Sequence, residues 1–388
     1  MRTWSLALVV ALSCIPLTTL SAQSFLAESP DFTSARLRAL GGIHAALADD
    51  ITTLFSNPAG FRQAGPQFSV SEVSLHLAGP VFGLADLVSK VAHSSNPLAM
   101  ITDPILSNLY ASAAVDGPVS FGYVGNGLGF GFFNSTGVTV TTRGTIPTLN
   151  AAVQENLMFV GGYAFPIPLP ESWQSTLDMG VSLKLYAQGT ISTTQDVLTV
   201  ISLLSSGQSP SLINQPFTLD VGLGVDAGLL YSWSRTISVG IVGRNIYTPV
   251  ARSQYQSVTG LGSQAPDSSS GIAPFDLSMG VMYSPSLVRW EPFVTSLKIM
   301  LDYSDIFDFL MHPATASNPI LHLGAGVEVV TLRILALRVG LGDGYFSAGL
   351  GVNLTAFQLD FAVFGSELSL EPGLHPVYNV MLGLAFRY

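Results

Sequence analysis

The sequence predicts an all-β protein: a transmembrane antiparallel β-barrel of about 14 strands with an N-terminal hatch plugging the lumen. Three observations carry this prediction. Apolar and polar residues alternate with period two in most of the chain after residue 67. Only 10% of the 388 residues are charged and 48% are hydrophobic, which leaves little charge for a water-soluble surface. The chain also ends in an alternating segment, YNVMLGLAFRY, with an aromatic last residue.

The first 22 residues are expected to be a cleaved secretory signal. Arg2 is followed by an apolar run over 4–12 and by small residues up to Ala22. Cys14 leaves a second interpretation open, because the residues before it loosely resemble the signal of a lipid-anchored protein. If cleavage follows Ala22, the mature chain has no cysteine, so no disulfide and no cysteine chemistry is expected.

Residues 23–66 are expected to form the hatch. A barrel of about 14 strands is too wide to be filled by its own side chains, so its lumen must hold a plug or remain a channel. The segment ALGGIHAALADDITTLFSNPAGF is rich in small residues and lacks the strand pattern. Glycine and alanine allow close approach to a wall, and an Asn-Pro pair fixes a turn. Two interpretations of this Asn-Pro turn are open: it gates the lumen, or it is a simple turn that ends a helix.

Residues 67–388 are expected to form the barrel. In the segment 217–231, for example, every odd residue from Phe217 to Tyr231 is apolar, and the even residues are mostly aspartate, glycine or threonine. The predicted strands cover 68–78, 118–125, 127–141, 153–166, 176–190, 217–232, 235–247, 274–284, 295–304, 320–330, 333–342, 344–354, 357–366 and 376–388.

The alternatives to a β-barrel fit the sequence less well. The most apolar stretch, 321–341, carries four ionisable residues, and each charge near the centre of a spanning helix costs roughly 2.5–3.5 kcal/mol. A soluble β-sandwich would also alternate, but its solvated faces need more charge than this chain has. The net charge of −10 and the 15 basic residues argue against a nucleic-acid partner.

The connections have unequal lengths, and the long ones follow mostly odd-numbered strands, as expected of extracellular loops. The loops at 79–117, 191–216 and 305–319 are expected to be partly helical. Their apolar positions are candidates for capturing a hydrophobic ligand, or else they pack the loops onto the barrel rim. The candidate residues are Leu84, Leu87, Val88, Val91, Phe307 and Leu310.

Several charged residues fall on the inferred lumen faces of strands. Lys184 and Arg338 are candidates for binding a ligand head group. Lys298 and Arg387 also fall on the inferred lumen faces and are candidates for the same reason. The other interpretation is that these cations pair with aspartates that also face the lumen. Those aspartates are Asp220, Asp226, Asp302 and Asp360.

The segment 35–61 resembles the N-terminal hatch of the FadL-type outer-membrane transporters of long-chain fatty acids and hydrocarbons. The matching features are Gly41-Gly42, the small residues 45–48, Asp49-Asp50 and the motif Asn57-Pro58-Ala59-Gly60. The resemblance implies hatch or gating roles for the Asp-Asp pair and for the four residues of the motif. It also implies a bacterial outer-membrane location, contact with membrane lipid, and recognition by the barrel-assembly machinery through the terminal Tyr388.

The resemblance further implies passive transport, in which a hydrophobic solute passes the hatch and leaves sideways into the membrane. The family has a kinked third strand, so the glycine-rich stretch 127–137 is the expected place for a weakened wall. A barrel that only docks protein partners is the alternative function. Catalysis is not expected, because His-Glu-x-x-His, Gly-x-Ser-x-Gly and phosphate-loop motifs are absent from the sequence. No cofactor and no metal are expected.

Overall fold

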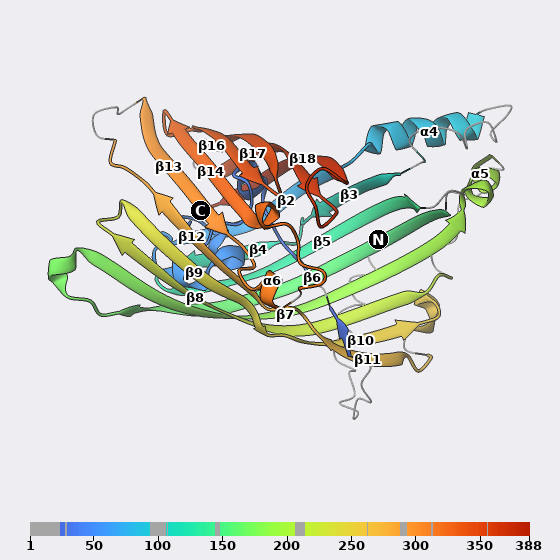
Figure 1. Ribbon diagram of the computed structural model, residues 1–388, viewed down its shortest axis with the longest axis horizontal. Helices are drawn as coiled ribbons and strands as arrows, with labels where there is room; N and C mark the ends of the chain where they lie inside the picture. Colours follow the sequence, from blue (N-terminus) through green and yellow to red (C-terminus); the bar gives the residue numbers. More distant parts are fainter. Residues whose placement is uncertain are drawn as a thin grey trace.

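The computed structural model describes residues 24–27, 29–93, 106, 108–143, 148–205, 214–261, 263–287, 293–311, 313–354 and 356–388 (Figure 1). The expected signal segment 1–22 and Cys14 lie outside the described residues. Parts of the loops 79–117 and 191–216 lie outside them as well.

The described strands join edge to edge in a closed antiparallel barrel of 14 positions, as the sequence predicts. The ring closes where β18 pairs with β2 and where β9 pairs with β12. The uninterrupted strands are β2 (Gln67–Ala78), β5 (Leu128–Arg143), β6 (Thr148–Ile167), β7 (Ser175–Asp196), β8 (Phe217–Trp233), β13 (Val294–Tyr303), β14 (Leu323–Thr331), β15 (Leu335–Gly342), β16 (Tyr345–Leu354), β17 (Phe357–Glu367) and β18 (Pro376–Arg387).

Three barrel positions are each split into two short strands. They are β3 (Tyr110–Asp116) with β4 (Phe121–Gly125), β9 (Ile237–Tyr247) with β10 (Pro249–Tyr255), and β11 (Asp267–Ile272) with β12 (Asp276–Tyr283). The sequence-based strand boundaries missed 110–116 and placed 248–273 in a loop. Most of β10 and β11 is polar, with the sequences RSQY and DSSSG. This hairpin extends the wall beyond the apolar band, so it lacks the alternation of apolar and polar residues by which a strand is recognised.

The split between β3 and β4 leaves a gap in the hydrogen-bond ladder. β2 pairs with β4 through residues 67–69 and with β3 through residues 74–78, so residues 70–73 have no strand partner on that side. The glycine-rich stretch 127–137, where a weak wall was expected, pairs with β6 along its whole length from Leu128. The interruption therefore lies in the neighbouring position of the barrel.

The two faces of the barrel wall differ as a membrane requires. Leucines such as Leu229, Leu301 and Leu350 are exposed on the outer face. Charged residues such as Glu328 and Arg338 are buried on the inner face. An apolar outside and a polar inside, with every strand paired around a ring, are the features of a barrel that spans a lipid bilayer, here the outer membrane.

The two ends of the barrel are built differently. One end has mostly short turns, such as the one joining β8 to β9, and the opposite end has α4 (Val81–His93) and α5 (Val197–Ser205) (Figure 1). Long loops mark the extracellular end of such barrels, so the short turns are periplasmic. The further short elements are α6 (Asp308–Met311), η4 (Glu171–Trp173), η5 (Val258–Gly260) and η6 (Pro319–His322). None of the described helices has the length and hydropathy needed to cross a bilayer.

The N-terminal segment lies inside the barrel. It contains α2 (Ala35–Ala39), α3 (Thr53–Ser56) and η1 (Pro58–Arg62), and almost all of their residues are buried. α2 contacts β15 to β18, and η1 contacts β5 to β8 on another part of the wall. Ahead of them, β1 (Ser24–Leu26) pairs in parallel with β11. The segment therefore bridges the lumen from one wall to the other, and we call residues 29–66 the hatch.

Candidate functional site

The hatch is seated against glycines on the inner face of the strands. A Cβ atom added to Gly228 would lie 1.9 Å from Asn57 Oδ1, and one added to Gly180 would lie 2.3 Å from the Pro58 carbonyl carbon. Gly340 is in the same relation to Leu40, at 2.3 Å. Only glycine leaves room for such close backbone approach. The glycines that alternate with apolar residues in the sequence thus form a surface that fits the hatch backbone. We call this surface the seat.

The Asn57-Pro58-Ala59-Gly60 motif forms the tip of the hatch that enters this seat. Asn57 Oδ1 accepts a hydrogen bond from Ala59 N at 3.0 Å and so caps η1, and Pro58 occupies the first turn. Asn57 Nδ2 donates to the carbonyl oxygens of Ala45 at 2.8 Å and of Leu229 at 3.2 Å. Asn57 therefore joins the turn, the rest of the hatch and the wall in one set of hydrogen bonds.

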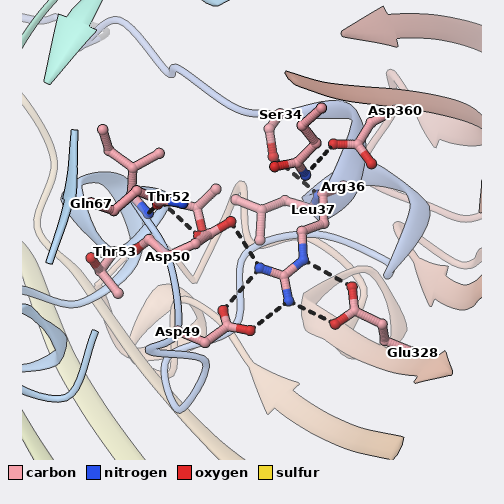
Figure 2. Close-up of polar contacts among 12 residues, drawn as sticks. Ser34, Arg36, Leu37, Asp49, Asp50, Thr52, Thr53, Gln67, Glu328 and Asp360 are labelled. Atoms are coloured by element: carbon pink, nitrogen blue, oxygen red, sulfur yellow. Dashed lines mark hydrogen bonds and ion pairs between the residues drawn. The ribbon is translucent and has the colours of Figure 1, made fainter. Parts of the chain in front are cut away.

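A buried ion-pair network, which we call the latch, fixes α2 to the wall (Figure 2). All five N–H donors of Arg36 bind carboxylates: Asp49 at 2.8 and 2.9 Å, Asp50 at 2.9 Å, and Glu328 on β14 at 2.7 and 2.9 Å. Two of these carboxylates belong to the hatch and the third belongs to the barrel. Because Arg36 and Glu328 are almost fully buried, removing either partner would leave a charge uncompensated.

The latch continues along the inner wall at the periplasmic end. Glu328 also accepts a hydrogen bond from Arg338 Nε at 2.8 Å, and Arg338 Nη1 donates to Asp360 at 2.5 Å. Lys298 pairs with both Asp49 and Glu328. Arg387 reaches Asp50 at 3.1 Å. The cations of the latch are thus all engaged by carboxylates, and these paired charges line a cavity of about 200 Å³.

The electrostatic environment keeps the two hatch aspartates ionised. Burial alone would raise the pKa of the Asp49 carboxyl, but the charges of Arg36 and Lys298 outweigh it and hold this pKa well below the ordinary value. The pKa of Asp50 is lowered in the same way, against burial, by Arg36 and Arg387. Thr52 adds hydrogen bonds from its amide and hydroxyl to Asp50 Oδ1 at 2.8 and 2.5 Å.

A second polar contact holds the middle of the hatch. His44 is fully buried, and its Nδ1 lies 2.5 Å from Asp302 Oδ2 on β13. The second oxygen of Asp302 accepts a hydrogen bond from Ala45 N at 2.7 Å, and His44 Nε2 lies 3.0 Å from the Leu40 carbonyl oxygen. Both His44 nitrogens therefore face acceptors.

On the extracellular side of the hatch there is a cavity of about 230 Å³. We call it the upper cavity. It is lined by the apolar side chains of Pro30, Phe32, Ile43, Leu54, Phe55 and Met158, and by the polar residues Ser29, Asp31, Lys184, Asp226, Arg244, Asn245 and Asp276. The apolar side chains come mostly from the hatch, and the charged ones come mostly from the strands. A concave site that combines apolar surface with polar groups can bind a small hydrophobic molecule.

The structure shows where the predicted lumen cations lie. Lys184 lines the upper cavity and pairs with Asp226 at 2.9 Å. Arg338 instead belongs to the latch, which lies toward the periplasmic end of the barrel. The two candidates therefore do not form one binding site. The inferred lumen aspartates are paired as well, with Asp220 bound to Arg252 at 2.6 Å.

The predicted loop residues divide into two groups. In α4, Leu87 and Val91 are buried in a cluster with Val197 and Ile201 of α5, so these two positions pack the helices together. Leu84 is partly buried and Val88 is exposed. The second group lies in and just before α6, where Phe307 stacks on Phe275 at 6.5 Å and Leu310 is 72% exposed. Of the six predicted residues, Leu310 therefore offers the largest exposed apolar fraction.

Sequence reasoning missed the centre of the latch. Arg36 lies within the segment that carries the family resemblance, but nothing in the sequence connects it to Glu328, which is 292 residues away. A usable signal was present in the hatch itself, since two arginines, Arg36 and Arg38, precede the Asp49-Asp50 pair in a segment otherwise made of small and apolar residues and one histidine. Buried like charges next to each other need a cation nearby.

Comparisons with known proteins find similarity in structure and not in sequence. No protein-family model and no curated protein matches the chain. Among solved structures, the Pseudomonas putida toluene transporter TodX has a TM-score of 0.44 and 14% identity, covering 94% of this chain and 99% of its own. A Pseudomonas aeruginosa FadL homologue has a TM-score of 0.45 and 12% identity, with the same coverage. The CymD monoaromatic hydrocarbon channel has a TM-score of 0.44 and 13% identity, covering 90% of this chain and 95% of its own.

Replacing Arg36 with methionine should release the hatch. The change leaves Asp49, Asp50 and Glu328 short of a cation, and breaking a buried pair costs about 3–5 kcal/mol. The release is measured with a Ser56→Cys reporter in a chain that also carries Cys14→Ser. Ser56 suits this purpose because it is buried in α3 and its hydroxyl has no hydrogen-bond partner among the described residues. We expect maleimide labelling of the folded barrel to be at least roughly tenfold faster with Arg36→Met. Arg235→Met removes an exposed arginine from the turn between β8 and β9, outside the hatch, and should leave labelling slow. Equal rates in both variants would contradict the latch.

The latch should also weaken in acid. A carboxyl whose pKa is lowered by folding stabilises the folded state above its unfolded pKa of about 4, and that contribution is lost as the pH falls through the lowered value. Asp49 and Asp50 both have lowered pKa values. Conductance of the barrel in planar bilayers should thus stay low and constant from pH 8 to 5 and rise below about pH 4. A rise between pH 7 and 5 would point to a histidine instead.

Proposed function

We propose that this protein is a passive outer-membrane transporter for small hydrophobic molecules. The observation that carries the proposal is the position of the upper cavity: the hatch supplies most of its apolar lining, and the hatch itself lies inside the lumen and is held by polar contacts. Polar contacts of this kind can form again with water or with other partners, so the hatch can take a second position in which these groups are satisfied differently. A solute bound in the upper cavity would be in position to leave when the hatch shifts.

The charges below the hatch favour a sideways exit. A hydrophobic solute moving straight toward the periplasm would have to pass the latch, where Arg36, Lys298 and Arg338 are paired with carboxylates. Separating such pairs around an apolar molecule leaves charges without partners and costs several kcal/mol for each, on the order of the penalties for buried ions. Release into the bilayer avoids this cost.

Aromatic side chains lie in contact between the upper cavity and the interrupted wall position. Phe32 and Phe55 line the cavity, and Phe133 on β5 is 5.9 and 4.7 Å from them between ring centroids. The next residue, Asn134, closes the interruption: its Nδ2 donates to the Gly117 carbonyl oxygen at 3.0 Å, and its own carbonyl oxygen accepts from Gly117 N at 2.8 Å. We infer that solute leaves between β2 and β5, where β3 and β4 are separated.

A reversible lock on the hatch tests the proposed function. A Cβ on Gly383 of β18 would lie 3.6 Å from Ala35 Cβ, which suits a disulfide. In a Cys14→Ser chain with Ala35→Cys and Gly383→Cys, we expect uptake of labelled methyl laurate to fall to background when oxidised and to recover on reduction. The cells should lack their own transporter for such solutes, and Gly383→Cys alone is the matched control. Undiminished uptake through the locked hatch, or no uptake by the unlocked chain, would defeat the proposal.

The exit route is tested by Asn134→Ala. Loss of this side-chain bond at the interruption should raise the rate at which solute leaves the cavity, by roughly fivefold for a bond worth about 1 kcal/mol. The measurement is transfer of a fluorescent hydrophobic ester from the protein into acceptor vesicles. Thr139→Ala is the control, because Thr139 bonds Ser112 between the same two positions where the backbone ladder is intact. Similar rates for both variants would place the exit elsewhere.

A further inference from the structure

The middle of the hatch is held by a histidine whose two ring nitrogens both face acceptors. His44 is fully buried. Its Nδ1 lies 2.5 Å from Asp302 Oδ2 on β13, and its Nε2 lies 3.0 Å from the Leu40 carbonyl oxygen. The other oxygen of Asp302 accepts a hydrogen bond from Ala45 N at 2.7 Å. An ionised carboxylate can accept both of these bonds, and a carbonyl oxygen can only accept.

The protonation state of His44 follows from this geometry. A neutral imidazole has one N–H group, and its second nitrogen is an acceptor. Either neutral tautomer would therefore place a nitrogen lone pair against an oxygen acceptor in a fully buried site, where an unmade hydrogen bond is costly. The imidazolium donates from both nitrogens. Because imidazole is a stronger base than a carboxylate, the proton between His44 and Asp302 lies on the ring.

The strands around His44 place glycines beside it and charges only further along. A Cβ added to Gly326 on β14 would lie 3.1 Å from His44 Nε2, and one added to Gly280 on β12 would lie 1.7 Å from Asp302 Oδ1. The next charged lumen positions on these strands are engaged by other partners. They are Lys298 on β13, Glu328 on β14 and Arg338 on β15, all in the latch, and Asp276 on β12, which binds Arg244. Asp302 is thus the carboxylate that balances His44.

We propose that His44 is a positioning residue that seats the hatch as an imidazolium, so that release of the hatch gives up a proton. The inference goes beyond the proposed function, because it concerns how the hatch is held whichever solute passes. Ile43, the residue before His44, lines the upper cavity. A solute bound there touches the segment that this pair holds in place.

The sign of the pH dependence follows from the group that is released. A histidine in water loses its proton at about pH 6.5. The contribution of the His44–Asp302 pair is therefore complete below about pH 6.5 and declines as the pH rises above it. The latch changes in the opposite direction, because its carboxylates are protonated in acid. The latch stays closed at neutral pH, so the pair changes how often the hatch opens and does not by itself leave an open pore.

Labelling of the Ser56→Cys reporter, in the full chain with Cys14→Ser in lipid nanodiscs, tests the proposal. His44→Gln keeps a neutral donor beside Asp302 and removes the titrating ring. Its labelling rate is divided by that of the chain with His44 at the same pH, which cancels the pH dependence of the thiol. We expect this ratio to be at least roughly tenfold at pH 6, as for a charge-assisted hydrogen bond, and to fall by up to about tenfold for each pH unit above about 6.5.

His76→Gln is the matched control, because this histidine of β2 bonds Asn379 of β18. Its ratio should stay at about one at every pH. For His44→Gln, a raised ratio that is the same at every pH would overturn the proposal, since it would give His44 a purely structural role. A ratio of about one throughout would overturn it as well.

Nitrogen NMR of the chain with labelled histidines provides a measurement on the wild-type hatch. At pH 7.5 one histidine should show two protonated ring nitrogens, although a histidine in water, with a pKa of about 6.5, is mostly neutral there. This signal should be absent from His44→Gln. If no histidine of the wild type shows it, the proposal is wrong even where the variant fails to fold. None of these results depends on solute uptake, so failure here leaves the transport proposal as it stands.

Discussion

The arrangement of the lumen depends on the burial of Arg36. A guanidinium taken out of water is tolerated only when its donors are satisfied and its charge is balanced. Here two carboxylates from the hatch and one from the wall do both at once. The hatch therefore cannot leave its seat without separating these charges, and the barrel cannot lose Glu328 without unbalancing the hatch. One buried cation makes the docked position of the hatch specific.

Shape reinforces this electrostatic constraint. The glycines of β7, β8, β14 and β15 that face the lumen remove side chains where the hatch backbone touches the wall, as at Gly180, Gly228 and Gly340. Glycine in a strand interior weakens the strand, so this seat has a cost in barrel stability. The cost is offset because neighbouring strands pair over long registers, for example along all of β6 and β7.

The sequence predicted the barrel well because successive residues of a strand face opposite sides of the wall. Apolar residues facing lipid therefore alternate with polar residues facing the water inside. It failed at β3, β10 and β11, where polar residues occupy both faces or the strand is short. The hatch motif 49–60 was recognised through its resemblance to a family. Glu328 could not be assigned to it, because pairing across the lumen joins residues that are distant in sequence and leaves no local pattern.

The upper cavity has apolar side chains from the hatch beside its charged residues, whereas the cavity at the latch is lined mostly by charged and polar groups. A hydrophobic molecule gains by entering the upper cavity, at roughly 25 cal/mol for each Å² of apolar surface it buries. It would lose that gain, and more, among the paired charges of the latch. The aromatic side chains of Phe55 and Phe133 lead instead toward the interrupted wall. The polarity of the lumen, more than its width, therefore decides where such a molecule can go.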